Sequence, residues 1–156
     1  MSPRLERCLA PLCLSAVLLV GLAPAAAAQT RDQTIGVVKT LSGSATLTRA
    51  DVTGTLRAGA SMREGDRIDT GADGSVGVTF RDNTRIALGP RSRVVLARFV
   101  FKPADKQYGF GLSLARGTLE YMSGLIAKLA PEAVSIETPT STIGVRGTRF
   151  LARVAQ

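Results

Sequence analysis

The sequence predicts an all-β fold, a single domain of short antiparallel or solenoid-like strands resembling a β-roll or short β-solenoid, with at most one short helix. Three observations support this prediction. No long stretch keeps the 3.6-residue apolar period of an amphipathic helix. Short runs instead alternate between apolar and polar residues, as half-buried strands do. The 16 glycines recur between these runs, at the positions where turns are expected.

Residues 1–28 are predicted to be a cleaved signal peptide, which takes no part in the fold. Arg4 and Arg7 form a short basic region, an apolar stretch follows over 9–23, and small residues occupy 26–28, the pattern that signal peptidase recognises. An uncleaved membrane anchor is the alternative, but the stretch is short for a span of about 20 residues. We therefore expect a periplasmic or secreted chain, with a short N-terminal extension at 29–34 and one β-domain at 35–154.

Strands in the first part of the domain are expected in this order. A strand over 34–39 places Ile35 and Val37 on one face, and a second over 45–49 places Ala45 and Leu47 inward. Residues 51–54 are interpreted as a turn-rich connection. Residues 65–71 form a strand between two turns.

The middle of the chain shows the clearest alternation. Val76, Val78 and Phe80 point one way in a strand over 75–80, and after a polar turn at 81–84 the pattern resumes with Ile86 and Leu88. A further strand is expected over 93–101, followed by an exposed loop at 102–107.

The last part contains a predicted change of register. Leu112 and Leu114 share a face, and Leu119 and Tyr121 continue the apolar pattern, but at odd instead of even positions. A bulge or turn at Arg116-Gly117 accounts for the shift. One or two helical turns are expected within 122–130, and strands at 134–138 and 143–154 close the domain.

Composition argues against catalysis and against bound metal. The chain has no His, and its two cysteines, Cys8 and Cys13, lie in the removable segment. The commonest general base and the commonest metal ligand are therefore missing. A Ca²⁺ site at Asp66, Asp69 and Asp73 is disfavoured, because that stretch lacks a dense run of oxygen ligands. We expect a protein that is not an enzyme and that uses no cofactor and no metal.

The charge balance is basic. The net charge is +8, and removing Arg4, Arg7 and Glu6 leaves 18 basic and 11 acidic residues. For an exported chain, the expected anionic partners are glycolipid, anionic polysaccharide or an acidic protein surface. Few aromatic residues interleave with the arginines, so the stacking platform of a single-strand nucleic-acid binder is missing, and nucleic acid is not an expected partner.

Several short motifs follow one another in a fixed order. Residues 65–71 read Gly-Asp-Arg-Ile-Asp-Thr-Gly, and residues 82–88 read Asp-Asn-Thr-Arg-Ile-Ala-Leu. The closing stretch runs from Thr138-Pro139 to Gly-Val-Arg-Gly-Thr at 144–148. Together these resemble the signature of the FecR domain family over about 35–154, with Asn83 where that family usually has Gly.

The resemblance implies a periplasmic β-domain that works as a binding and interaction module. In signalling members of that family, the domain contacts an outer-membrane transporter, and a membrane helix and a cytoplasmic anti-sigma segment carry the signal inward. Only a few residues precede the signal peptide here, so we expect the stand-alone secreted form. A transporter or a membrane regulator is the expected partner. The residues that carry the signature are expected to serve turns and packing: Gly65, Asp66, Thr70, Thr138, Pro139, Gly144, Gly147 and Thr148.

Arginines are the candidate partner-binding residues. Arg146 lies between glycines at 144 and 147 and is placed to present its guanidinium to a carboxylate or phosphate. Internal pairing of Arg146 with Asp66 or Asp69 is the alternative. An arginine run includes Arg85, Arg91 and Arg93, in which the last two would share a strand face and form an anion-binding strip. Solvated arginines that protect a sheet edge are the alternative for this run.

Two functions follow from these features. The first is protein–protein contact through edge-strand pairing, in which main-chain bonds give affinity and alternate side chains give specificity. The second is recognition of an anionic envelope polysaccharide or glycolipid by the arginine strip.

Overall fold

The computed structural model describes residues 33–145 and 149–155. The expected signal peptide at 1–28, most of the expected extension, and Arg146, Gly147 and Thr148 lie outside the described residues.

Strands dominate the described chain, as predicted. The described chain also contains one short α-helix and two single turns of 3-10 helix. The strands are β1 (Gly36–Ser42), β2 (Ala45–Arg49), β3 (Val52–Thr55), β4 (Ser61–Met62), β5 (Arg67–Thr70), β6 (Ser75–Phe80), β7 (Arg85–Leu88), β8 (Arg93–Lys102), β9 (Gln107–Met122), β10 (Val134–Glu137), β11 (Thr142–Gly144) and β12 (Arg149–Val154). The helix is α1 (Leu125–Leu129), and the 3-10 turns span Pro103–Asp105 and Pro131–Ala133. The predicted all-β class is confirmed.

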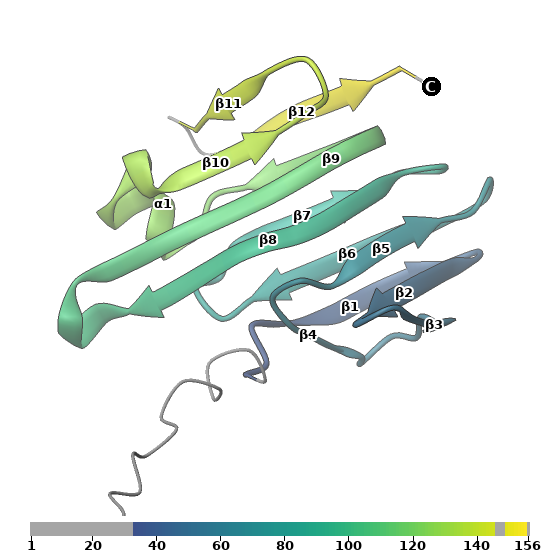
Figure 1. The fold of residues 1–156 in the computed structure, drawn as a ribbon, viewed down its shortest axis with the longest axis horizontal. Helices are drawn as coiled ribbons and strands as arrows, with labels where there is room; N and C mark the ends of the chain where they lie inside the picture. Colours follow the sequence, from purple (N-terminus) through teal and green to yellow (C-terminus); the bar gives the residue numbers. More distant parts are fainter. Residues whose placement is uncertain (1–32, 146–148, 156) are drawn as a thin grey trace, which may run out of the picture.

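The strands form one curled sheet that folds over its own core. One layer runs β4-β1-β6-β7-β9-β12, and the other runs β3-β2-β5-β8-β9-β10-β11. Strand β9 belongs to both layers, because its first half pairs with β8 and its second half with β7. Pairing is antiparallel except between β9 and β10. Figure 1 shows the strands rising in sequence order from β1–β4 at one end to β10–β12 at the other.

A bulge at Ala115-Arg116, next to Gly117, lets β9 cross from one layer to the other. Arg93 lies opposite Arg116, but Val94 lies opposite Leu114, so β9 holds one extra residue there. Gly117 has a φ of +90°, and a Cβ at this position would come within 2.3 Å of the Ser92 hydroxyl oxygen. Even-numbered residues before the bulge, such as Leu114, and odd-numbered residues after it, such as Leu119, therefore both point into the core. The predicted bulge is confirmed.

Aromatic side chains fill the space between the layers. The Phe80 ring of β6 meets the Phe110 ring of β9 edge-on at 5.0 Å, and Phe110 contacts Tyr121 at 5.7 Å. Tyr121 then stacks on Phe150 of β12 at 5.2 Å. Phe150 is the last ring in this series of contacts and is only partly buried. The core therefore reaches the β12 edge of the sheet.

Two expectations for the first strands are wrong. Val38, not Val37, is buried in β1, and the register shifts between Val38 and Thr40. Residues 51–54 were expected to be a connection, but residues 52–55 form β3, which pairs with β2. Ala50 and Asp51 both have positive φ, 45° and 67°, as the central residues of a tight hairpin turn of type I′ do.

Two fully buried carboxylates hold loops against the sheet. Asp66 accepts bonds from Arg49 Nε at 2.8 Å, Arg49 Nη2 at 2.7 Å and the Arg63 amide at 2.7 Å. Asp82 accepts bonds from the Thr84 amide and hydroxyl, at 3.1 and 2.6 Å, and from the Ile126 amide in α1 at 3.3 Å. A buried charge costs several kcal/mol unless such bonds offset it, so these contacts fix the positions of the two turns.

Candidate binding surfaces

The arginine run does not form one strip. Arg85 lies on β7 in one layer and Arg93 on β8 in the other. Arg91 lies in the corner between these strands with a φ of +51°, and β8 begins only at Arg93. The expectation that Arg91 and Arg93 share a strand face is therefore wrong, because the chain turns between them.

Asp66 and Asp69, the suggested internal partners of Arg146, are both occupied by other arginines. Asp66 binds Arg49 with both carboxylate oxygens. Asp69 contacts arginines from three strands, described next. Arg146 itself lies outside the described residues.

An arginine cluster surrounds Asp69 on the outer side of the layer that contains β5, β8 and β9. We use this name for Arg67, Arg93 and Arg116. Arg67 Nε lies 3.1 Å from Asp69 Oδ2, Arg93 Nε bonds to Oδ1, and Arg116 Nη2 lies 3.7 Å from Oδ1. Arg67 also donates to the Thr48 hydroxyl at 3.2 Å. Of these three arginines, only Arg93 belongs to the arginine run predicted from the sequence. The i, i+2 spacing of Arg67 and Asp69 on one strand could also have predicted the contact between these two residues.

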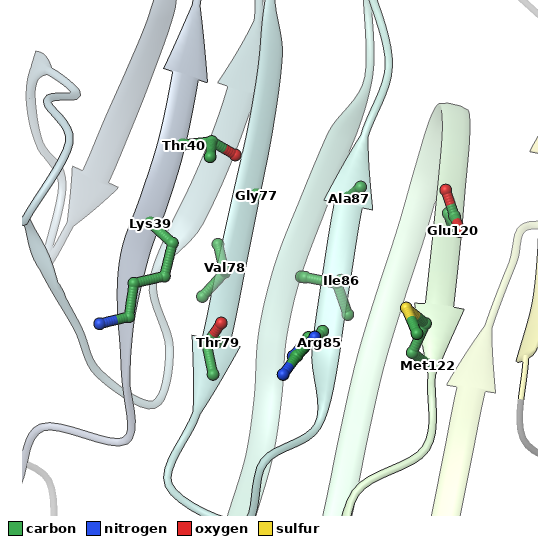
Figure 2. A pocket seen from close by; sticks show the side chains of 10 residues that line it. All are labelled: Lys39, Thr40, Gly77, Val78, Thr79, Arg85, Ile86, Ala87, Glu120 and Met122. Atoms are coloured by element: carbon green, nitrogen blue, oxygen red, sulfur yellow. The ribbon is translucent and has the colours of Figure 1, made fainter.

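A trough crosses the outer side of the other layer (Figure 2). It runs over β1, β6, β7 and β9 with a volume of about 520 Å³. The trough is deepest at Gly77 and Ala87, which carry little or no side chain. Its charged lining residues are Lys39, Arg85 and Glu120. Glu120 is paired with Arg149 of β12. The trough thus combines small and apolar residues with a few charged side chains, one of which is already paired.

The edges of the sheet offer a third kind of surface. Among the described residues, β12 pairs with β9 along one side and with no strand along the other. Its outward side chains are Arg149, Leu151 and Arg153, and Leu151 is 67% exposed. At the opposite end of the sheet, β3 is exposed along its length, with Val52 74% exposed.

The residues of the sequence signature lie mainly in turns. The Thr70 hydroxyl donates to the Gly89 carbonyl at 2.7 Å and accepts from the Ser92 amide at 2.8 Å, which ties two corners together. Gly65 has a φ of +87°. The Thr138 hydroxyl accepts from the Ser141 amide at 3.0 Å beside the exposed Pro139. Space around Gly144 is open.

The described residues provide no assembled metal site. Within 33–145 and 149–155, no three His, Cys, Asp or Glu side chains come together as ligands. In the same part of the chain, no helix is long and apolar enough to cross a membrane.

Comparison with known families gave one informative match. Residues 66–156, more than half of the chain, match the family model described as FecR protein. Comparison with curated proteins and with solved structures gave no match.

Proposed function

The chain belongs to the FecR family, a family of signalling and regulatory domains, and on this premise we propose that it is a non-enzymatic protein–protein interaction module of the cell envelope. We propose further that residues 1–28 are removed as a signal peptide and that the domain at 35–154 works in the periplasm. Its partner would be a transporter or a membrane regulator.

The unpaired side of β12 is the observation that carries this proposal. Among the edge strands of the described chain, β12 has six residues, whereas β3 has four and β11 has three. An exposed edge presents a row of amide and carbonyl groups to an incoming strand. A partner strand that pairs there gains main-chain hydrogen bonds, each worth about 1 kcal/mol net.

Side chains along β12 would add specificity to this pairing. Phe150, Ala152 and Val154 face the core, and Phe150 and Val154 are only partly buried. An added strand with apolar residues at alternate positions would cover them and extend the core. On the outer side, Arg149 and Arg153 flank the exposed Leu151, which favours acidic residues on either side of an apolar one in the partner.

The test is crosslinking of a tagged chain in the native envelope, followed by identification of the captured protein. Proline is placed in turn at positions 150 to 153. Variants that keep the thermal unfolding of the parent chain are those whose amide faces the free edge. We expect these folded variants to lose the transporter or regulator that the parent captures.

Proline in the opposite edge strand, as Thr53→Pro, is the matched control, because Thr53 lies between the hydrogen-bonded pairs of the β2–β3 hairpin and its amide faces away from β2. It changes an equally exposed edge and should leave capture intact. Capture that persists in every folded β12 variant would contradict edge pairing at β12. Recovery of glycolipid or polysaccharide without a consistent protein would contradict the interaction-module proposal itself.

A further inference from the structure

The arginine cluster carries more positive charge than its structural role requires. Three guanidinium groups surround a single carboxylate, which leaves a local charge of +2. One arginine would satisfy the pairing of Asp69, and each further arginine adds repulsion between like charges. Arg116, at 3.7 Å, is beyond hydrogen-bond distance from the carboxylate. The cluster therefore keeps two positive charges that Asp69 does not neutralise.

Unused hydrogen-bond donors in the cluster face solvent. Each guanidinium has five N–H donors, and Arg67 and Arg93 contact Asp69 through Nε. The arginine side chains are 41%, 39% and 46% exposed, whereas Asp69 is 17% exposed. The acid thus lies beneath the arginines, and the donor-rich, positively charged side of the cluster points outward.

We propose that the arginine cluster binds a phosphate group, either as free phosphate or as the phosphomonoester of a lipid headgroup. A phosphomonoester carries about −1.5 to −2 charges at pH 7, which matches the +2 of the cluster better than a single carboxylate does. Planar guanidiniums bind phosphate oxygens in bidentate fashion. Thr46, opposite Asp69 on β2, is exposed and supplies a further hydroxyl beside the cluster. Arg67 and Arg93 lie in the layer that does not contain β12, and Arg116 is next to Gly117, which pairs with Val154 at the end of β12.

The first experiment titrates the full chain with inorganic phosphate at low ionic strength and follows the arginine Nε–H signals by NMR. We expect saturable shifts for Arg67, Arg93 and Arg116. Arg93→Gln and Arg116→Gln should each weaken binding about tenfold or more, as expected for loss of a charge-assisted hydrogen bond. Arg85→Gln, which removes the same charge from the other layer, is the matched control and should leave binding unchanged.

Asp69→Asn separates a binding role from a purely structural one. Removal of the carboxylate raises the local charge from +2 to +3, so phosphate should bind more tightly to a variant that stays folded. If the arginines only support Asp69, the same variant loses their ordering and gains no affinity. That result, a linear unsaturable response, or equal weakening by Arg85→Gln would overturn the proposal.

Vesicles identify the source of the phosphate. Phosphatidylcholine vesicles with and without phosphatidic acid are mixed with the protein and floated. Flotation that needs phosphatidic acid and is lost in Arg93→Gln supports a lipid phosphomonoester. Phosphate binding in solution without flotation supports free phosphate. Flotation that is equal for Arg93→Gln and the parent chain would count against the cluster as the lipid site.

Discussion

Replacement of Arg49 by Met should destabilise the domain severely, because it leaves the buried carboxylate of Asp66 without its counterion. Arg49 provides two bonds to Asp66, at 2.8 and 2.7 Å, and a third to the Ser61 carbonyl at 2.8 Å. Asp66 is fully buried, whereas Arg49 is 35% exposed. Removal of one partner from a buried pair costs about 3–5 kcal/mol, a large part of the 5–15 kcal/mol that folds a typical domain.

Replacement of the other partner, Asp66, should cost less stability. Asp66→Asn keeps an oxygen that can accept the bond from the Arg63 amide, and it leaves the half-exposed Arg49 able to reach water. We therefore expect about 1–2 kcal/mol for Asp66→Asn and a larger loss for Arg49→Met. Urea unfolding measures both values, and Arg57→Met, in an exposed loop, should stay within about 0.5 kcal/mol of the parent.

The ordering of the two variants tests the reasoning. A loss below about 1 kcal/mol for Arg49→Met would refute it, because the burial of Asp66 would then not depend on Arg49. A loss for Asp66→Asn equal to that for Arg49→Met would show that the bonds matter and the unpaired charge does not.

Three further predictions concern alkaline stability, the bulge and export. Burial raises the pKa of Tyr121 from 10.0 to about 12, with a smaller contribution from the charge of Asp82. The neutral phenol is thus favoured in the folded state, and about 2 kcal/mol of stability is lost as pH rises from 10 to 12; Tyr121→Phe should lack this loss in unfolding measurements at each pH. Gly117→Ala should lower stability by about 2 kcal/mol or more, because φ is +90° and the new Cβ would meet Ser92; unchanged urea unfolding would argue against the described corner. N-terminal sequencing of protein from the periplasmic fraction should begin at Gln29, and a start at residue 1 or 2 would favour the membrane anchor.

Local alternation predicted strands well where one face is buried. Residues 75–80 show Val76, Val78 and Phe80 at strict alternation, and β6 has these bounds. Leu114 and Leu119 are an odd number of residues apart, yet both were expected inside, and this predicted the bulge next to Gly117. The pattern failed at β1 because Val37 and Val38 are both apolar, and only the pairing with β6 decides which is inside. It missed β3 because every residue there is exposed, so no alternation marks it.

The candidate sites were harder to predict because they depend on long-range pairing. The arginine run looks continuous in the sequence, yet the corner before β8 sends Arg85 and Arg93 into different layers. The arginine cluster joins β5, β8 and β9, which are brought together only by the sheet register. Similarly, Asp66 pairs with Arg49, which is 17 residues away in the sequence, and no spacing rule identifies that partner.

Site-specific photo-crosslinking in the native envelope tests edge pairing most directly. A photoreactive side chain replaces Leu151 at the β12 edge in one protein and Ala87 in the trough in another, since the two positions lie in the same layer but only the first is on an edge. We predict that position 151 captures a single transporter or membrane regulator and that position 87 does not. Capture of that partner from position 87 alone, or of no protein from position 151, would contradict the proposed mode of binding.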